Sequence, residues 1–363
     1  MATVTTAPGV YIEEDASPAI SVNQGATAIP LFIARFTPLA GNDSGGIIRI
    51  SNWLSFTQLF TDGDKPTTAY QAIKLYFQNG GGACYVLAMA EAKKESNELN
   101  TLPEQIESVG EIILFAVPEN DKAYREEVYG ALQMLLDKDR GYFLLADSDD
   151  GKVPSSLGKS SHVAVYYPAL IAAVDTSLTV PASALMAGVY CKTDRERGVW
   201  KAPANVVLNG ASDVSVRVTD DAQGAMNLAG VNVIRYFNGR GVVVWGARTL
   251  QDDDNWRYIP VRRLFDAAER DIKKAMRSLV FEPNNQLTWK RVQTAIENYL
   301  YKLWQQGGLS GNQADEAYFV RIGKDLTMTA DDINQGKMIV QVGMAAVRPA
   351  EFIILQFTQD MSQ

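Results

Sequence analysis

The chain has 363 residues, of which 47% are hydrophobic and 21% are charged, and this composition predicts a folded protein with one large or two ordinary domains. The net charge of -8 argues against nucleic acid as a main partner, because phosphate binding requires a basic face. Two cysteines are too few for a disulfide framework, the chain opens without a basic and apolar leader, and no run of about 18 apolar residues predicts insertion into a membrane.

The first part of the chain predicts an extended arm followed by an α/β domain. Residues 1–25 form the arm, since Pro8, Gly9 and Pro18 prevent a long helix. Over residues 26–200, strands and helices alternate in a way typical of a parallel sheet covered by helices, with a polar stretch up to about residue 109. We expect strands at 27–36, 83–90, 111–118, 141–147 and 162–174, and helices at 67–82 and 121–138.

The second part, residues 201–347, predicts an α+β domain. Residues 231–250 resemble a hairpin whose turn is Asn238-Gly239, a pair that accepts positive φ. Apolar residues at helical spacing predict two long helices, 261–281 and 287–304. Strands are expected at 317–322, 337–347 and 351–358, the last of them inside a terminal segment, 348–363, that is apolar although chain ends usually fray.

Residues that carry enzymatic or metal chemistry are scarce. His162 is the one histidine, so a Ser-His-Asp or Cys-His system would have to use it, and no nucleophile motif lies beside it. Two cysteines and one histidine argue against a zinc site. The stretch 151–160 resembles a phosphate-binding loop, but six residues separate Gly151 from Gly158 where that motif has four. The sequence therefore predicts no catalytic residue, no metal and no cofactor.

Three segments resemble a known family: DRERGVWKAPAN (194–205), GVVVWGARTLQDDDNWRYIPVRRL (241–264) and KDLTMTADDINQGKMIVQVGMAAVRPAEFIILQF (324–357). The opening PGVYIEE is also similar. On these segments the chain resembles contractile tail sheath proteins, which coat myophage tails, R-type bacteriocins and phage-tail-like extracellular injection particles. The length favours the compact injection-particle version. The region of about 90–190 matches in α/β character alone, and the type VI secretion sheath fits less well because it is built from two chains.

The resemblance implies a structural function. Sheath subunits stack as six-fold rings in a helical sleeve around an inner tube, and contraction of the sleeve drives the tube through a target membrane. It implies an outer domain (26–200) that is subtilisin-like in shape without proteolysis, and an inner sheath core domain (201–347). The implied partners are other copies of the chain, the tube protein, and baseplate and terminal cap proteins. Assembly would take place in the bacterial cytoplasm, before release as an extracellular particle or virion tail.

The resemblance also implies that both terminal arms are donated to sheets of neighbouring subunits, where added strands form backbone hydrogen bonds. This would explain why both chain ends are apolar. The expected arm residues are Val10, Tyr11, Ile12, Ile20, Val22, Phe352, Ile353, Ile354, Leu355 and Phe357.

Two groups of charged residues are candidates for contacts in such a sleeve. For the first group the ordinary alternative is a solvated helix face, where an ion pair contributes under about 1 kcal/mol. For the second group it is an ordinary loop and helix that join two strands. The candidates for contacts between subunits are Asp252, Asp253, Asp254, Arg262, Arg263, Arg270, Lys273 and Lys274. The candidates for contact with the tube are Asp331, Asp332 and Lys337, in a short helix within 327–337 where Thr329 and Asp332 have capping-box spacing.

Two alternatives stay open at this point. The chain could be a minor sheath paralogue next to the baseplate, which has the same sequence features as the main sheath. It could also be a hydrolase in which His162 acts as the base on an α/β domain.

Overall fold

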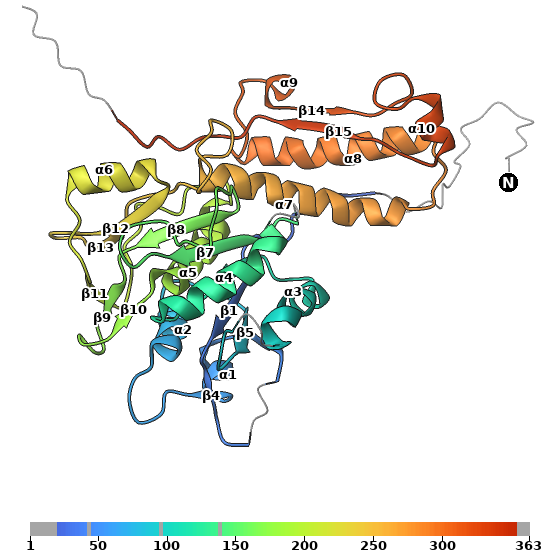
Figure 1. Ribbon diagram of the computed structural model, residues 1–363. Helices are drawn as coiled ribbons and strands as arrows, with labels where there is room; N and C mark the ends of the chain where they lie inside the picture. Colours follow the sequence, from blue (N-terminus) through green and yellow to red (C-terminus); the bar gives the residue numbers. More distant parts are fainter. Residues whose placement is uncertain (1–19, 42–44, 94–96, 137–139, 354–363) are drawn as a thin grey trace, which may run out of the picture.

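An eight-stranded, mostly parallel sheet forms the centre of the chain up to Val244 (Figure 1). The computed structural model describes residues 20–41, 45–93, 97–136 and 140–353. The strand order is β13-β12-β8-β7-β6-β1-β5-β3, and only the outermost pairings, β3–β5 and β12–β13, are antiparallel. The strands are β1 (Pro30–Ala34), β3 (Ile47–Ile50), β5 (Cys84–Ala88), β6 (Leu114–Ala116), β7 (Phe143–Asp147), β8 (Val163–Tyr167), β12 (Val231–Phe237) and β13 (Gly241–Val244).

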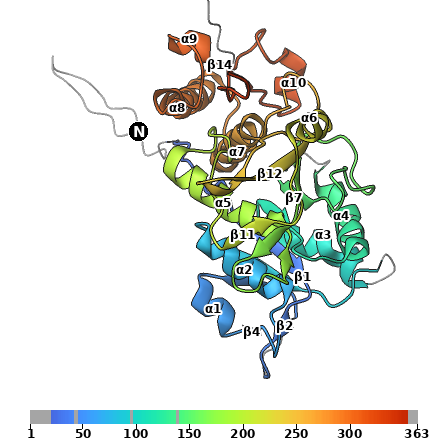
Figure 2. The same cartoon turned by 90° about the vertical axis from the view of Figure 1, so that its left-hand side faces the viewer.

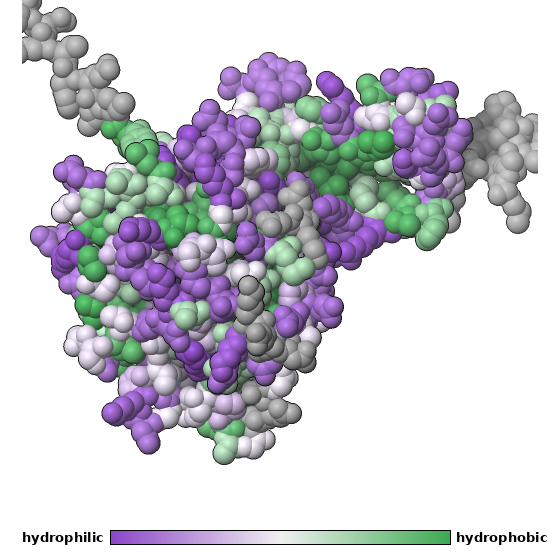
Figure 3. Space-filling model, in the orientation of Figure 1, coloured by the Kyte–Doolittle hydropathy of each residue, from purple (hydrophilic) through white to green (hydrophobic). Residues whose placement is uncertain are grey.

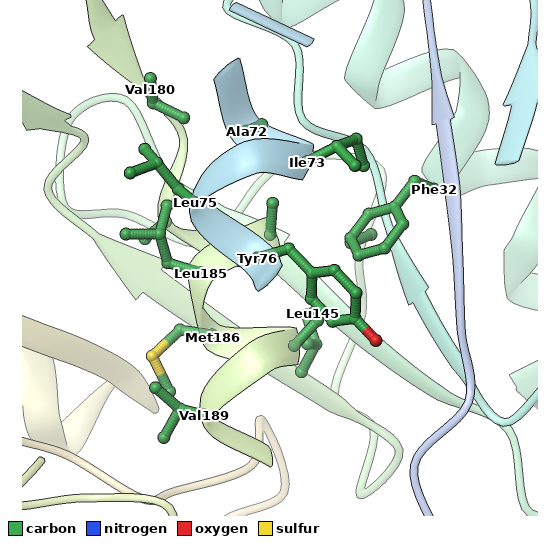
Figure 4. Close-up of a cluster of buried hydrophobic side chains, with 14 of the residues drawn as sticks. Phe32, Ala72, Ile73, Leu75, Tyr76, Leu145, Val180, Leu185, Met186 and Val189 are labelled. Carbon is green, nitrogen blue, oxygen red and sulfur yellow. The ribbon is translucent and has the colours of Figure 1, made fainter. Parts of the chain in front are cut away.

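Helices cover both faces of this sheet, which is why its central strands are continuous apolar runs. In β1, Phe32 and Ala34 point into the core formed with α2 (Thr68–Gln78) and α5 (Ala182–Arg197), part of which is drawn in Figure 4. Leu31 and Ile33 point to the opposite core, formed with α3 (Asn97–Val109) and α4 (Lys122–Leu136). The predicted parallel α/β layer is therefore confirmed.

Smaller elements complete the α/β part. They are β2 (Thr37–Pro38), α1 (Trp53–Thr57), β4 (Phe60–Thr61), β9 (Leu170–Ala172), β10 (Thr179–Val180), β11 (Ala211–Val214) and α6 (Asp220–Leu228). The single strand expected at 162–174 is wrong, because β8 lies in the main sheet and β9 in a separate three-stranded sheet. Pro168 lies between them and has no N–H to donate to a ladder.

A second layer, built from the C-terminal part, packs at one end of the α/β part (Figure 2). Its elements are α7 (Ile259–Met276), a 3₁₀ turn (Arg277–Leu279), α8 (Gln286–Gln305), α9 (Ala314–Ala317), β14 (Tyr318–Arg321), α10 (Ala330–Asn334) and β15 (Gln341–Met344). The apolar faces of α7 and α8 meet in a third core, which includes Leu264, Val292 and Ile296. None of the helices among the described residues has the length and apolar character needed to cross a bilayer.

Several expectations differ from the structure. The boundary expected at residue 200 separates strands that share one sheet, since β12 and β13 extend the α/β layer. Helices α3, α5 and α6 are not predicted by periodicity; α5 is buried all around from Ala182 to Cys191, so it lacks a polar face that would mark it. In the hairpin turn only Gly239 has positive φ, at 79°. Glu351–Ile353 form no strand, and the rest of the strand expected at 351–358 lies outside the described residues.

Candidate assembly surfaces

The small sheet β14–β15 is the first candidate surface. Tyr318 pairs with Met344 and Arg321 with Gln341 in antiparallel register, and Val320 packs inward toward α8. On the outer face, the ring of Phe319 lies directly over Gly343, where a Cβ atom would be 2.2 Å from Phe319 Cε1. Figure 3 shows an apolar area over β15 and α8. Within the described residues this sheet has no third strand, and a two-stranded sheet offers edges that template further strands.

The C-terminal segment, residues 345–353, is attached to the rest of the subunit at two places. The first attachment is backbone pairing: Ser310 N–H donates to the Ala345 carbonyl at 2.7 Å, and Val347 N–H donates to the Gly308 carbonyl at 3.3 Å. The segment then crosses a cavity of about 690 Å³ that is lined by Trp200 and Trp245. At its end, Phe352 and Ile353 are 70% and 80% exposed.

The second attachment is a polar cluster around the carboxylate of Glu351. Arg248 holds it as a fork, with Nε 3.0 Å from Oε1 and Nη2 2.7 Å from Oε2. Tyr258 donates its hydroxyl at 3.1 Å, and Asn227 donates Nδ2 at 2.8 Å. Burial by itself would raise the pKa of Glu351, but the hydrogen bonds from Arg248, Asn227 and Tyr258 outweigh it and lower this pKa. The carboxylate is therefore charged and fully engaged at neutral pH.

The described part of the N-terminal segment packs on its own chain. Val22 is buried in the core of α7 and α8, and Ile20 packs against the same core. Gly25 N–H donates to Asp271 Oδ1 at 3.0 Å, and Thr27 Oγ1 donates to Asp194 Oδ2 at 2.6 Å. In the subunit, Val22 is thus a core residue and not a free arm residue. The arm residues Val10, Tyr11, Ile12, Ile354, Leu355 and Phe357 lie outside the described residues.

The three arginines expected at a charged surface make polar contacts inside the subunit. Arg262 pairs with Asp266 at 2.7 Å and Arg263 pairs with Asp194 at 2.6 Å, with all four side chains at most 6% exposed. Arg270 donates to the Gly141 carbonyl at 2.8 Å. The expectation of an exposed charge contact is corrected for these residues, because this face of α7 packs toward the α/β part.

The other charged candidates lie at the surface. Arg257 bridges Asp252 at 3.0 Å and Asp254 at 3.3 Å. Asp253 accepts hydrogen bonds from the backbone N–H groups of Asn255 and Trp256, which stabilises the turn before α7. Lys273 and Lys274 are exposed in the last turn of α7. They stay candidates for contact with another copy.

The predicted capping box at α10 is confirmed. Asp332 N–H donates to Thr329 Oγ1 at 3.1 Å, and Thr329 N–H donates to Asp332 Oδ2 at 3.0 Å. The hydrogen bonds from Thr329 lower the pKa of Asp332, with Lys337 at 4.0 Å adding to the effect. Asp332 therefore has a local structural role, while Asp331 is exposed and takes no part in the cap.

His162 is buried between β8 and α7. Ser161 Oγ is 3.3 Å from its Nδ1, and Asp266 Oδ1 is 3.3 Å from its Nε2. The Nε2 atom nevertheless makes no hydrogen bond with any described group, and Asp266 is already paired with Arg262. An acid that does not orient the histidine cannot serve as the third member of a triad. Among the described residues, no cluster of three His, Cys, Asp or Glu side chains could hold a metal ion.

Comparisons with known proteins decide between a structural protein and a hydrolase. Residues 112–250 match the phage tail sheath protein central domain, and residues 251–360 match the phage tail sheath C-terminal domain. The chain belongs to the phage tail sheath family. Its relatives are structural sheath proteins, not enzymes.

Solved structures of injection particles match nearly the whole chain. The sheath of the anti-feeding prophage in its contracted state is 65% identical over 98% of this chain and 100% of that one, with a TM-score of 0.90. A chain in the baseplate structure of the same particle, 6-fold symmetrised, is 64% identical over 99% and 100%, with a TM-score of 0.88. The contracted sheath complex of PVC, an extracellular contractile injection system, is 44% identical over 99% of both chains, with a TM-score of 0.83.

Curated relatives match over a shorter stretch. A prophage major tail sheath protein of Pseudomonas aeruginosa strain UCBPP-PA14 is 27% identical over 183 residues, which are 49% of this chain and 46% of that protein. A tail sheath protein of Vibrio phage KVP40 is 26% identical over 188 residues, which are 50% of this chain and 27% of that protein. The chain thus matches about half of the first relative's length and about a quarter of the second's.

Sequence reasoning missed two features of these surfaces. The first is the Glu351 cluster, because Arg248 and Glu351 are 103 positions apart and no local spacing connects them. The second is an apolar tip between α7 and α8, where Val280 and Leu287 are exposed and Phe281, at φ 76°, is fully exposed. The signal available for the tip was an aromatic residue in a Pro- and Asn-containing turn between two amphipathic helices.

Proposed function

We propose that the chain is the main sleeve subunit of a contractile injection particle. Copies stack as rings around an inner tube, and a change from an extended to a contracted sleeve drives the tube into a target membrane. The observation that supports this most directly is the 65% identity, over nearly the whole chain, to a sheath solved in its contracted state. The role is structural, and no catalytic step is assigned to His162.

The sleeve is linked by strand addition between copies. Residues 354–363 of one subunit, and residues 1–19 of another, add to the open β14–β15 sheet of a neighbour. The support is the two-stranded state of this sheet, its exposed apolar outer face at Phe319, and the exposed Phe352 and Ile353 that lead into the last segment. Added strands supply the backbone hydrogen bonds that an open edge lacks.

The further partners are the inner tube, the baseplate and a terminal cap. Asp331, on the exposed side of α10, is the candidate for contact with the tube, and the exposed pair Lys273 and Lys274 is a candidate for contact between copies. The subunits assemble in the bacterial cytoplasm and leave the cell as part of a released particle.

A second candidate is a minor sheath paralogue next to the baseplate. The 64% identity to a chain in a baseplate structure favours it. Counting copies per particle by quantitative mass spectrometry separates the two roles: a main sheath is present in many rings, whereas a paralogue is present in one or a few.

The linking segment can be tested by truncation. The full chain and a chain ending at Ile353 are co-expressed with the tube and baseplate proteins of the particle, and sleeves are counted by negative-stain microscopy. We expect long sleeves from the full chain and folded, unassembled subunits from the shorter one, because the truncation removes only residues beyond the Glu351 cluster. A full-length chain in which Ile354, Leu355 and Phe357 are changed to Asn separates loss of apolar side chains from loss of length. Normal sleeves from the truncated chain would refute linkage through residues 354–363.

A further inference from the structure

The last described residues are held in an unusual way. Among residues 348–353, the hydrogen bonds to other described residues are all made by the side chain of Glu351. The segment lines the cavity that Trp200 and Trp245 also line. Its polar contacts with the rest of the subunit therefore converge on one carboxylate.

The cluster fixes both the position and the orientation of the carboxylate. Its donors come from three different places: Asn227 from α6, Arg248 from the chain after β13, and Tyr258 from the residue that precedes α7. The guanidinium contacts both oxygens, and a planar fork permits one orientation of the carboxylate plane.

The backbone on the receiving side of the cluster is held by contacts that do not involve Glu351. Asn232 is fully buried, and its amide accepts from Arg248 N–H at 2.7 Å and donates to the Arg248 carbonyl at 2.8 Å. The backbone of Arg248 also pairs with that of Tyr258. The guanidinium of Arg248 also donates to the Asn227 carbonyl at 3.2 Å, so both the backbone and the side chain of Arg248 have partners outside the C-terminal segment.

We propose that Glu351 is a positioning residue that anchors the C-terminal segment to its own subunit, so that Phe352 and Ile353 directly after it are presented in one direction to a neighbouring copy. This rests on the proposed function in sleeve assembly. Phe352 and Ile353, exposed directly after the anchor, are the first residues that a second copy would cover. With the anchor released, the same residues would sample many directions, and a segment that must be ordered on binding binds more weakly.

The first test measures the freedom of the segment in the free, full-length subunit. Phe352→Cys carries a nitroxide spin label, and the two native cysteines are buried and do not compete for it. We compare labelled chains with Glu351, Glu351→Ala and Glu351→Gln. We expect the mobile fraction of the label to rise about tenfold or more in Glu351→Ala, which corresponds to loss of a charge-assisted hydrogen-bond cluster, and to rise less in Glu351→Gln.

The second test measures assembly with the native Phe352. Glu111→Gln is the control, because Glu111 also accepts from a tyrosine, Tyr85, at 2.9 Å and faces an arginine, Arg49, at 4.0 Å. These partners belong to β5 and β3, at the opposite end of the main sheet from β12 and β13. We expect Glu351→Ala to lower the number of sleeves about tenfold, while Glu111→Gln assembles normally. Thermal unfolding of each variant checks that the subunit is folded. If Glu351→Ala does not fold, Glu351→Gln takes its place in the assembly test, because glutamine preserves the shape of the side chain.

Two results overturn the proposal: an unchanged label mobility in both Glu351 variants, or a mobile label together with normal sleeves. Either leaves the proposed function intact as long as the chain ending at Ile353 fails to assemble. If that shorter chain forms normal sleeves, the linking role itself is wrong, whatever the Glu351 variants do.

Discussion

Arg263 lies between α7 and α5, where its guanidinium donates to both carboxylate oxygens of Asp194 and stacks on the ring of Tyr190 with its Cζ 4.5 Å from the ring centre. Both members of the ion pair are buried. A buried pair contributes little net stability compared with apolar residues, but removing one member leaves the other charge without compensation. The pair therefore matters for the fold of the subunit before any contact between copies forms.

We expect Arg263→Met to lower the free energy of unfolding by about 3–5 kcal/mol, because the Asp194 carboxylate stays buried without its partner. Lys273→Met, on the exposed side of the same helix, is the control and should change it by no more than about 0.5 kcal/mol. Urea unfolding followed by circular dichroism measures both. If Arg263→Met has normal stability and yet forms no sleeves, the original expectation of a contact between subunits holds for this residue.

At the scale of the element, the helices that could be predicted from the sequence are the amphipathic ones. Helix α8 was predicted to within one residue at each end, and the start of α7 to within two residues, because each has one apolar and one polar face. The predicted end of the first helix, residue 281, was wrong, because α7 ends at Met276 and a 3₁₀ turn, Arg277–Leu279, follows it. Helix α5 was missed because it is buried on all sides and has no polar face. The break after Tyr167 was missed because Pro168 was included in one strand predicted over 162–174. Of the candidate surfaces, the capped helix α10 was predicted in full, because a capping box is a local pattern.

Helix α10 allows its charge to be separated from its cap. If Asp331 contacts the tube, Asp331→Asn should weaken retention of the tube protein on purified subunits several-fold without changing stability, since Asp331 takes no part in the cap. Thr329→Ala should weaken it too, because loss of an N-cap costs about 1 kcal/mol of helix stability. Thr219→Ala, which removes the N-cap of α6, is the matched control and should leave tube binding normal. Co-purification with tagged tube protein measures the effect, and unchanged retention in Asp331→Asn would place the tube contact elsewhere.

At the scale of the whole molecule, contacts distant in sequence connect the two layers. Gly25, Thr27 and the Arg263–Asp194 pair join the N-terminal segment, α5 and α7. The sequence has apolar residues near both chain ends, yet it could not show that Val22 belongs to the core of its own subunit or that Glu351 meets Arg248. Such pairings depend on how the layers pack, and neither periodicity nor composition encodes that.

Residues 20–25 pack on their own subunit, and two truncations measure what they contribute to its stability. A chain beginning at Ile20 keeps Val22 in the core and the hydrogen bond from Gly25 to Asp271, so its free energy of unfolding should match that of the full chain. A chain beginning at Ala26 loses both, and we expect a decrease of about 2–5 kcal/mol from lost apolar burial and an unsatisfied buried acceptor. Both chains lack residues 1–19. Any difference between their free energies of unfolding in urea is therefore caused by residues 20–25. Equal stability of the two would mean that residues 20–25 do not pack on their own subunit in solution, and they would then return to the set of residues available for a neighbouring copy.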